Sequence, residues 1–330
     1  MTLSKLRNRI LLSLVFGVLV VAGLLVYGDL SGIVHSLATF RWVYLPAILG
    51  LTLFNYGLRF VKWEFYLGQI GVKGLHRWDS FLIFFAGLAM TITPGKVGEW
   101  LKSYLLKETS GTPIARSAPI VVAERFTDGY AMVLLSAGGL LLFKDGWQFV
   151  AVVTLVGLAV AFAFRSRPVA KVVLALADKL PGSHRFHDFL ASFYESSRTL
   201  FSPKNLLLAV ALGFVSWLGE GIAMYFVFRG LGEPGAWLLV VKSVFILSLA
   251  TLAGAVLLLP GGLGVAEGGI MGLSQVLVGL TKEGAATATL LIRVCTLWFG
   301  VALGVVTLLV VTRRLRTASP VKQAATASEQ

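Results

Sequence analysis

The sequence predicts an all-α polytopic membrane protein with about six full transmembrane helices and two re-entrant broken helical hairpins, arranged as an inverted repeat. Three observations predict this fold: long uncharged apolar runs, two apolar stretches interrupted by Pro-Gly, and a strong bias in the placement of lysine and arginine. Of the 330 residues, 57% are hydrophobic and only 14% are charged, whereas a soluble domain carries about 25% charge. A large soluble helical core does not need uncharged runs of spanning length, so a soluble fold is disfavoured.

Six apolar runs are long enough to be full spans, because a bilayer core needs roughly 20 apolar residues per helix. Residues 10–27, 146–164 and 294–312 contain no charged side chain at all. The basic start of the chain resembles a signal peptide, but the run that follows is too long for one and lacks an A-x-A cleavage site. We therefore expect a retained first span. The six predicted spans are 10–28, 42–60, 117–143, 146–164, 205–228 and 287–312.

Two further apolar stretches, 80–95 and 243–280, are interrupted by proline and clustered glycines. These residues cannot continue a lipid-facing helix, because the backbone groups that they free need partners. Each stretch is therefore interpreted as a helix, a break and a second helix that together line a cavity. The break residues expected to line it are Pro94, Gly95, Pro260, Gly261 and Gly262.

The basic residues indicate the orientation. The net charge of +13 does not indicate a nucleic-acid partner, because lysine and arginine stand between the apolar runs, as the positive-inside rule requires. With six spans, the segments on the side of the termini hold 21 Lys and Arg against 4 on the other side. We therefore expect a multi-pass protein of the cell (cytoplasmic) membrane with both termini cytoplasmic.

One transmembrane domain is expected over residues 1–312, and no soluble domain fits. A cytoplasmic loop at 165–204 contains an amphipathic helix over 186–200, whose apolar side chains recur at helical spacing. The tail 313–330 is basic, then small and polar, and is expected to be disordered and cytoplasmic.

The two halves of the domain, about 42–143 and 205–312, repeat one pattern. Each contains a span, a Pro-Gly break followed by a glutamate, and a span with an arginine. The spacing is 26 residues both from Glu99 to Arg125 and from Glu267 to Arg293. Because the predicted topology places the two breaks on opposite sides, the halves would be inverted. Broken segments at matching positions of two halves indicate a transporter's binding site.

Charged side chains within spans are costly, so they usually face a cavity or a partner. Here they predict a polar pocket for an anionic or zwitterionic headgroup, in which arginines offer forked donors to phosphate. The alternative is a set of buried ion pairs that orient helices, or snorkelling at a helix end for Arg59. The candidate substrate-binding residues are Glu99, Arg125, Asp128, Glu267, Arg293, Glu124, Lys96, Glu220 and Arg59.

We expect no catalytic residues, no metal site and no cofactor. The four histidines lie in predicted loops, and no carboxylate or cysteine completes a metal-binding pattern around them. No phosphate-binding glycine loop, dinucleotide motif or G-x-S-x-G elbow occurs in the sequence. A function that does not hydrolyse ATP is therefore favoured.

Five segments resemble the transmembrane, flippase-like domain of lysylphosphatidylglycerol synthases, which occurs in the multiple peptide resistance factor and in stand-alone proteins. The segments are FNYGLRFVKWEFYL (54–67), PGKVGEWLKSYLL (94–106), ERFTDGYAMVLL (124–135), LPGGLGVAEGG (259–269) and IRVCTLWFGVALG (292–304). They follow the family's order across nearly the whole chain. The family's soluble aminoacyl-transferase domain is absent, so the resemblance implies movement or binding of a lipid and not lysylphosphatidylglycerol synthesis.

These observations favour a flippase-like protein, not an enzyme, that translocates or binds an anionic phospholipid or lipid carrier. One alternative is an accessory membrane subunit of a lipid or envelope-glycan synthase. A membrane glycosyl or acyl transferase is a further alternative, which the short outer loops disfavour. The expected partners are membrane lipids and no nucleic acid. Association with lipid- or glycan-synthesis enzymes, and a homo-oligomer, remain open.

Overall fold

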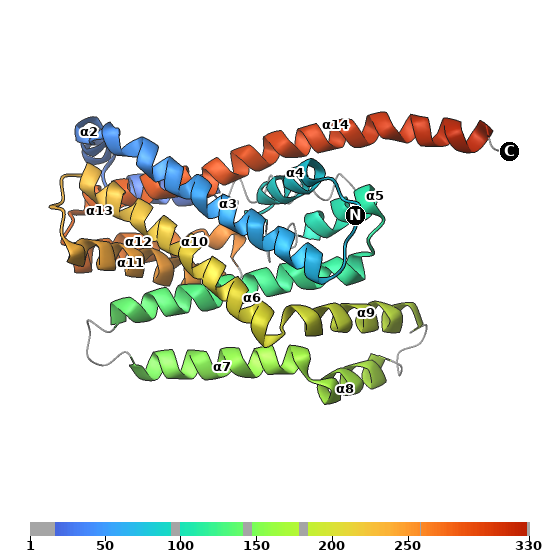
Figure 1. Cartoon of the computed structure of the whole chain (residues 1–330). Coiled ribbons are helices and arrows are strands. Elements are labelled where there is room, and N and C mark those ends of the chain that lie inside the picture. Colours follow the sequence, from blue (N-terminus) through green and yellow to red (C-terminus); the bar gives the residue numbers. More distant parts are fainter. Residues whose placement is uncertain (1–16, 94–99, 141–146, 178–183, 258, 329–330) are drawn as a thin grey trace.

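The computed structural model of the chain describes residues 17–93, 100–140, 147–177, 184–257 and 259–328 (Figure 1). Every element within those residues is a helix. The described chain starts with a helix over Gly17–Tyr27, which bends by 90° into α2 (Leu30–Thr39). Asp29 forms the bend with a positive φ of 52°. The helix predicted over 10–28 therefore ends at Tyr27, and α2, which the sequence did not predict, follows it.

Helix α2 is followed, in chain order, by long helices, short 3-10 turns and two π-helical segments. They are η1 (Trp42–Tyr44), α3 (Leu45–Gln69), α4 (Arg77–Leu88), α5 (Leu101–Ser110), α6 (Ile114–Leu140), α7 (Trp147–Arg165), α8 (Arg167–Ala177), α9 (His184–Leu200), α10 (Pro203–Gly230), α11 (Trp237–Val256), η3 (Pro260–Gly262), α12 (Val265–Leu273), η4 (Ser274–Val278), α13 (Lys282–Arg293), η5 (Val294–Trp298) and α14 (Phe299–Ser328).

Three of the described helices are long and apolar enough to cross a membrane: α10, α11 and the continuous helix Lys282–Arg314. The bent pair at the start of the chain meets the same criterion when taken as one span. Helices α3 and α6 have 25 and 27 residues, which is long enough to span, but both contain several charged side chains. The predicted number of six spans is therefore not confirmed by length and composition.

The apolar stretch 243–280 differs from its prediction. Its first arm, α11, begins earlier than expected, at Trp237, and has 20 residues, enough for a full span. Its second arm, α12 with η4, is shorter and ends at Gly279 in a left-handed conformation. The two arms of this stretch are therefore unequal in length.

Both broken stretches have the order helix, break, helix. Helix α4 ends at Leu88 and turns continue to Thr93, while α11 is followed by three glycines with positive φ, Gly261, Gly262 and Gly264. Only glycine adopts such angles without strain. Helix α5 packs against α4, and α12 against α11. The two breaks meet, because a Cβ atom at Gly261 would lie 3.5 Å from Ile92 Cγ2.

Helices α3 and α10 pack antiparallel at the centre of the bundle. Asn55 and Ser216 exchange hydrogen bonds: Asn55 Nδ2 donates to the Ser216 carbonyl at 3.1 Å, and Ser216 Oγ donates to the Asn55 carbonyl at 3.2 Å. The end of α10 lies at the start of α3, where Arg41 N donates to the Gly230 carbonyl. Because α4 follows the end of α3 and α11 follows the end of α10, the two broken stretches begin at opposite ends of the bundle (Figure 1).

Each broken stretch also packs against a long helix of the other half of the chain, α4 against α14 and α11 against α6. Glycines allow both contacts. A Cβ atom at Gly304 would overlap the α4 backbone at Ala89, and one at Gly139 would overlap the Phe245 ring. The halves are therefore interleaved rather than side by side.

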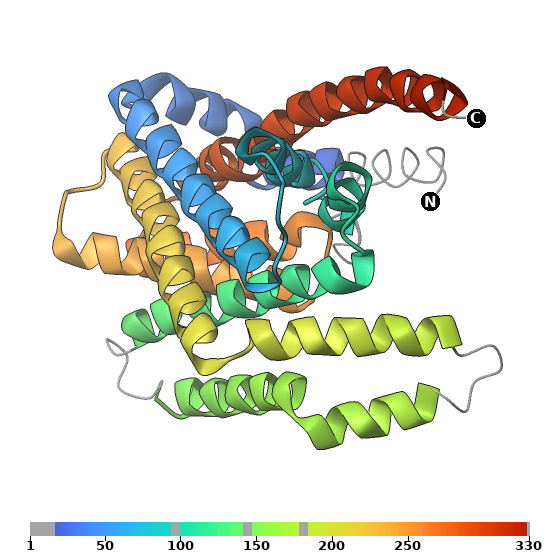
Figure 2. The ribbon, with the colours of Figure 1, turned by 45° about the vertical axis from the view of Figure 1, so that its right-hand side comes forward.

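The 165–204 segment forms two helices with a gap in the described chain between them. The predicted amphipathic helix is α9, which packs against α6 and α7 (Figure 2). The tail 313–330, expected to be disordered, continues α14 as a helix to Ser328. Arginine, leucine and alanine, which recur in this segment, have high helix propensity.

Candidate functional site

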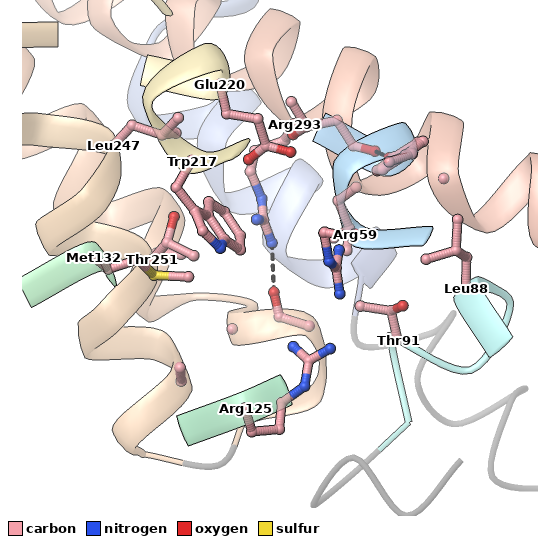
Figure 3. Close-up of a pocket in the computed structure, with 18 residues that line it drawn as sticks. Arg59, Leu88, Thr91, Arg125, Met132, Trp217, Glu220, Leu247, Thr251 and Arg293 are labelled. Carbon is pink, nitrogen blue, oxygen red and sulfur yellow. Dashed lines mark hydrogen bonds between the residues drawn. The ribbon is translucent and has the colours of Figure 1, made fainter. Parts of the chain in front are cut away.

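A partly open cavity of about 100 Å³ lies inside the bundle, where the two breaks meet. Three arginines and one carboxylate line it: Arg59 from α3, Arg125 from α6, Arg293 from α13 and Glu220 from α10 (Figure 3). The rest of the wall is mostly apolar or small, and includes Trp217, Leu247, Gly261 and Gly262. The cavity is large enough for several waters or a small anion.

Arg293 is held by two bonds. Its Nε donates to Glu267 Oε1 at 2.6 Å. Its Nη2 donates to the Gly261 carbonyl at 2.7 Å, the bond drawn in Figure 3. Glu267 and Arg293, which lie 26 residues apart in the second half, therefore form an ion pair. The other oxygen of Glu267 accepts from Gly264 N at 2.7 Å, which caps the start of α12. One carboxylate thus fixes both the arginine and the helix that follows the break.

A π-helical segment, η5, begins directly after Arg293. Such segments are rare and occur frequently at functional sites. The Tyr56 hydroxyl donates to the Thr296 carbonyl within it, so α3 is tied to this widened turn. Tyr56 is one helical turn from Arg59 on α3, and both side chains line the cavity. The hydrogen bond therefore fixes the position of α3 relative to Arg293.

Two more ion pairs lie behind the cavity wall, on α6. Asp128 pairs with Lys62 through its Oδ1 atom, and Arg59 Nε lies 3.8 Å from Asp128 Oδ2. Glu124 pairs with Lys102, whose ammonium is 4.8 Å from the centre of the Trp63 ring. All four members of these two pairs are nearly inaccessible to solvent. Glu124 and Asp128 do not line the cavity, so they neutralise buried cations rather than reach its space.

Lys62 and Lys102 were not among the candidate site residues, yet both are buried, as is much of Arg59. Space for the two lysines comes from glycines: Gly213 faces Lys62, and the stem of Lys102 crosses α4 at Gly87. The aromatic neighbours of Lys62 in FVKWEFYL (60–67) are a signal of burial that could have identified it.

Of the other candidate residues, some line the cavity and some lie outside the described part of the chain. Pro94, Gly95, Lys96 and Glu99 lie outside the described residues. Pro260 begins η3. Of the residues proposed to bind substrate, the cavity brings together Arg59, Arg125, Arg293 and Glu220, and Glu267 supports it from behind.

Comparison with known proteins shows to which family the chain belongs. Residues 11–304 match the family model described as the lysylphosphatidylglycerol synthase TM region. The chain belongs to this family. The matched range includes every residue that lines the cavity and both broken stretches.

Relatives of this lysylphosphatidylglycerol synthase TM-region protein occur in archaea. It is 27% identical over 260 residues to a UPF0104 membrane protein of Methanothermobacter thermautotrophicus, covering 72% of this chain and 75% of the relative. Another UPF0104 membrane protein of that organism is 23% identical over 309 residues, covering 88% and 90%. A UPF0104 membrane protein of Methanocaldococcus jannaschii is 25% identical over 236 residues, covering 68% and 94%. Family membership and the apolar helices make this chain a membrane protein.

Chemically, the cavity of this family member suits an oxyanion. Guanidinium groups donate planar, paired hydrogen bonds that match phosphate and carboxylate, and they stay charged in a buried site. The three guanidinium groups come from three different helices of both halves of the chain. Movement of the halves relative to each other would therefore change the spacing of the donors.

Proposed function

We propose that the protein is a flippase-like lipid transporter that takes the anionic headgroup of a phospholipid or lipid carrier into the arginine-lined cavity, without ATP hydrolysis. The observation that carries this proposal is the convergence of Arg59, Arg125 and Arg293 on one cavity at the junction of two broken helices. Charged side chains inside a membrane bundle are costly and mark substrate pathways. Three arginines around one cavity are best explained by an anion that enters the cavity.

An inverted-repeat architecture is part of the proposal. Its support is the pairing of the helices: α3 matches α10, α4 matches α11, α5 matches α12, and α6 matches α13 with α14. The matched central helices, α3 and α10, are antiparallel. The contact between α4 and α14 corresponds to the contact between α11 and α6, and the two broken stretches begin at opposite ends of the bundle. Such repeats place the substrate between the halves and permit alternating access by rocking.

The proposed setting is the cell membrane, with the termini in the cytoplasm. The end of α6 and the start of α9 lie at opposite ends of the bundle (Figures 1 and 2). We predict that a maleimide reagent that does not cross membranes will label Lys144→Cys in intact cells, and His187→Cys only after permeabilisation. The unmodified chain, whose Cys295 is buried, serves as the background. Labelling of His187→Cys in intact cells would contradict the orientation.

Lipid binding tests the function directly. We predict that phosphatidylglycerol raises the melting temperature of the detergent-purified protein, because a ligand that binds only the folded state stabilises it by RT ln(1 + [L]/Kd). Phosphatidylcholine with the same acyl chains is the matched control, since it keeps the apolar contacts and adds a cation to the headgroup. Proteoliposomes without nucleotide should also move a fluorescent phosphatidylglycerol between leaflets. Equal stabilisation by both lipids, with no translocation, would reject the proposal.

A further inference from the structure

Glu220 differs from the other buried carboxylates of the bundle. Asp128 pairs with Lys62, Glu124 with Lys102 and Glu267 with Arg293. Glu220 is 7% exposed, yet within the described chain it belongs to no ion pair. Its carboxylate is directed into the cavity beside the Arg293 and Arg59 side chains (Figure 3). Of the acidic residues described, Glu220 is the one that lines the cavity.

The charged and titratable groups around Glu220 come from three helices. Helix α3 contributes Arg59 and the Tyr56 hydroxyl, α13 contributes Arg293, and α6 contributes Arg125 and Asp128. The parts of α11, α12 and α14 that line the cavity are uncharged: Leu247, Thr251, Ala255, Ala266 and Gly300. The ionised form of Glu220 is therefore stabilised by the arginines of the cavity, at a distance.

Those arginines already have carboxylate neighbours, because Arg293 is bonded to Glu267 and Arg59 lies beside Asp128. An ionised Glu220 adds a negative charge in the space that an anionic headgroup would enter. Like charges that share a low-dielectric site repel strongly, which favours protonation of the weaker acid, here the carboxylate rather than the phosphodiester. A proton on Glu220 removes the repulsion and leaves the arginines to the incoming phosphate.

We propose that Glu220 is the proton-binding group of the transport site, so that each anionic headgroup enters together with one proton. On entry, the Glu220 carboxylate takes a proton from water and becomes a neutral carboxylic acid. On release, the acid returns the proton, and the carboxylate again faces Arg59 and Arg293. The inference rests on the proposed function and supplies a source of energy for it, since a proton gradient would then drive lipid movement.

Binding measured against pH tests this coupling. Phosphatidylglycerol remains anionic between pH 5 and pH 8, so a change in its affinity over this range reports the protein. In the full-length purified chain, we expect its affinity to fall about tenfold per pH unit once Glu220 is ionised, as uptake of one proton requires. In Glu220→Gln, which is permanently neutral and nearly isosteric, we expect tight binding that does not vary with pH.

Two more variants make the result decisive. Glu220→Asp keeps a titrating carboxyl and should keep the pH dependence, whereas Glu195→Gln, which removes an exposed carboxylate on α9, should leave it unchanged. At a pH where Glu220 of the free protein is ionised, a pH indicator in weakly buffered solution should record about one proton taken up per lipid bound by the wild type, and none by Glu220→Gln. If Glu220→Gln is not monodisperse, the change of lipid affinity with pH in the wild type and in Glu220→Asp still tests the proton coupling.

The outcomes separate the two proposals. Phosphatidylglycerol binding with equal affinity across the pH range, or a pH slope retained in Glu220→Gln, would overturn the proton coupling and leave the lipid site standing. Failure of phosphatidylglycerol to bind at any pH would reject the proposed function itself, and with it this inference.

Discussion

Replacement of Arg293 by lysine is expected to remove most lipid translocation while the protein still folds into the membrane. Lysine keeps a positive charge near Glu267, so no carboxylate is left buried and unneutralised. It cannot both pair with that carboxylate and reach the Gly261 carbonyl with a planar fork, as the guanidinium does. Loss of one hydrogen bond to a charged group costs about 1.5–3 kcal/mol, which corresponds to a decrease in rate of about tenfold to a hundredfold.

The measurement is the initial rate of fluorescent phosphatidylglycerol movement in proteoliposomes that hold equal amounts of protein. Arg125→Lys should behave like Arg293→Lys, because both arginines line the cavity. Arg229→Lys is the matched control: Arg229 lies at the end of α10, outside the cavity, and bonds to the Glu233 carbonyl. If both cavity variants translocate lipid at the wild-type rate, the two arginines only form ion pairs that orient the helices, and the proposed role in binding the headgroup is wrong.

Replacement of Lys62 by methionine should cause the largest loss of stability. It leaves Asp128 ionised in the core, and removal of one partner from a buried pair costs about 3–5 kcal/mol. Arg59, 3.8 Å from the other carboxylate oxygen, will offset part of that cost and will be drawn away from the cavity. We therefore expect a lower melting temperature together with weaker phosphatidylglycerol binding.

A double variant isolates the charge effect. Lys62→Met combined with Asp128→Asn removes both charges, so it should recover a large part of the melting temperature that Lys62→Met loses. Lys107→Met, at an exposed lysine of α5, controls for loss of a positive charge as such. An unchanged melting temperature in Lys62→Met would show that the pair contributes little to folding.

Much of the architecture follows from local features of the sequence. Proline and glycine set the breaks, because the backbone angles at Gly261 and Gly262 are strained for any other residue. Uncharged runs set the helices, and Glu267 and Arg293, two of the candidate site residues, form an ion pair in the structure. The motifs also identified the family that comparison confirms.

The tertiary structure decided which charges face the cavity and which lie behind it. Helices inside a membrane contact lipid on one side and apolar neighbours on the other, so hydrophobic periodicity does not distinguish the two faces as it does in water. For this reason, no periodicity indicated that Lys62 and Lys102 are buried counter-ions, or that Glu220 meets Arg59 and Arg293. Those contacts join residues far apart in the chain, and they depend on the rotation and crossing of helices that glycines bring close together. The sequence by itself therefore determined most of the long helices, the position of the second break and the family, while only packing determined the composition of the site.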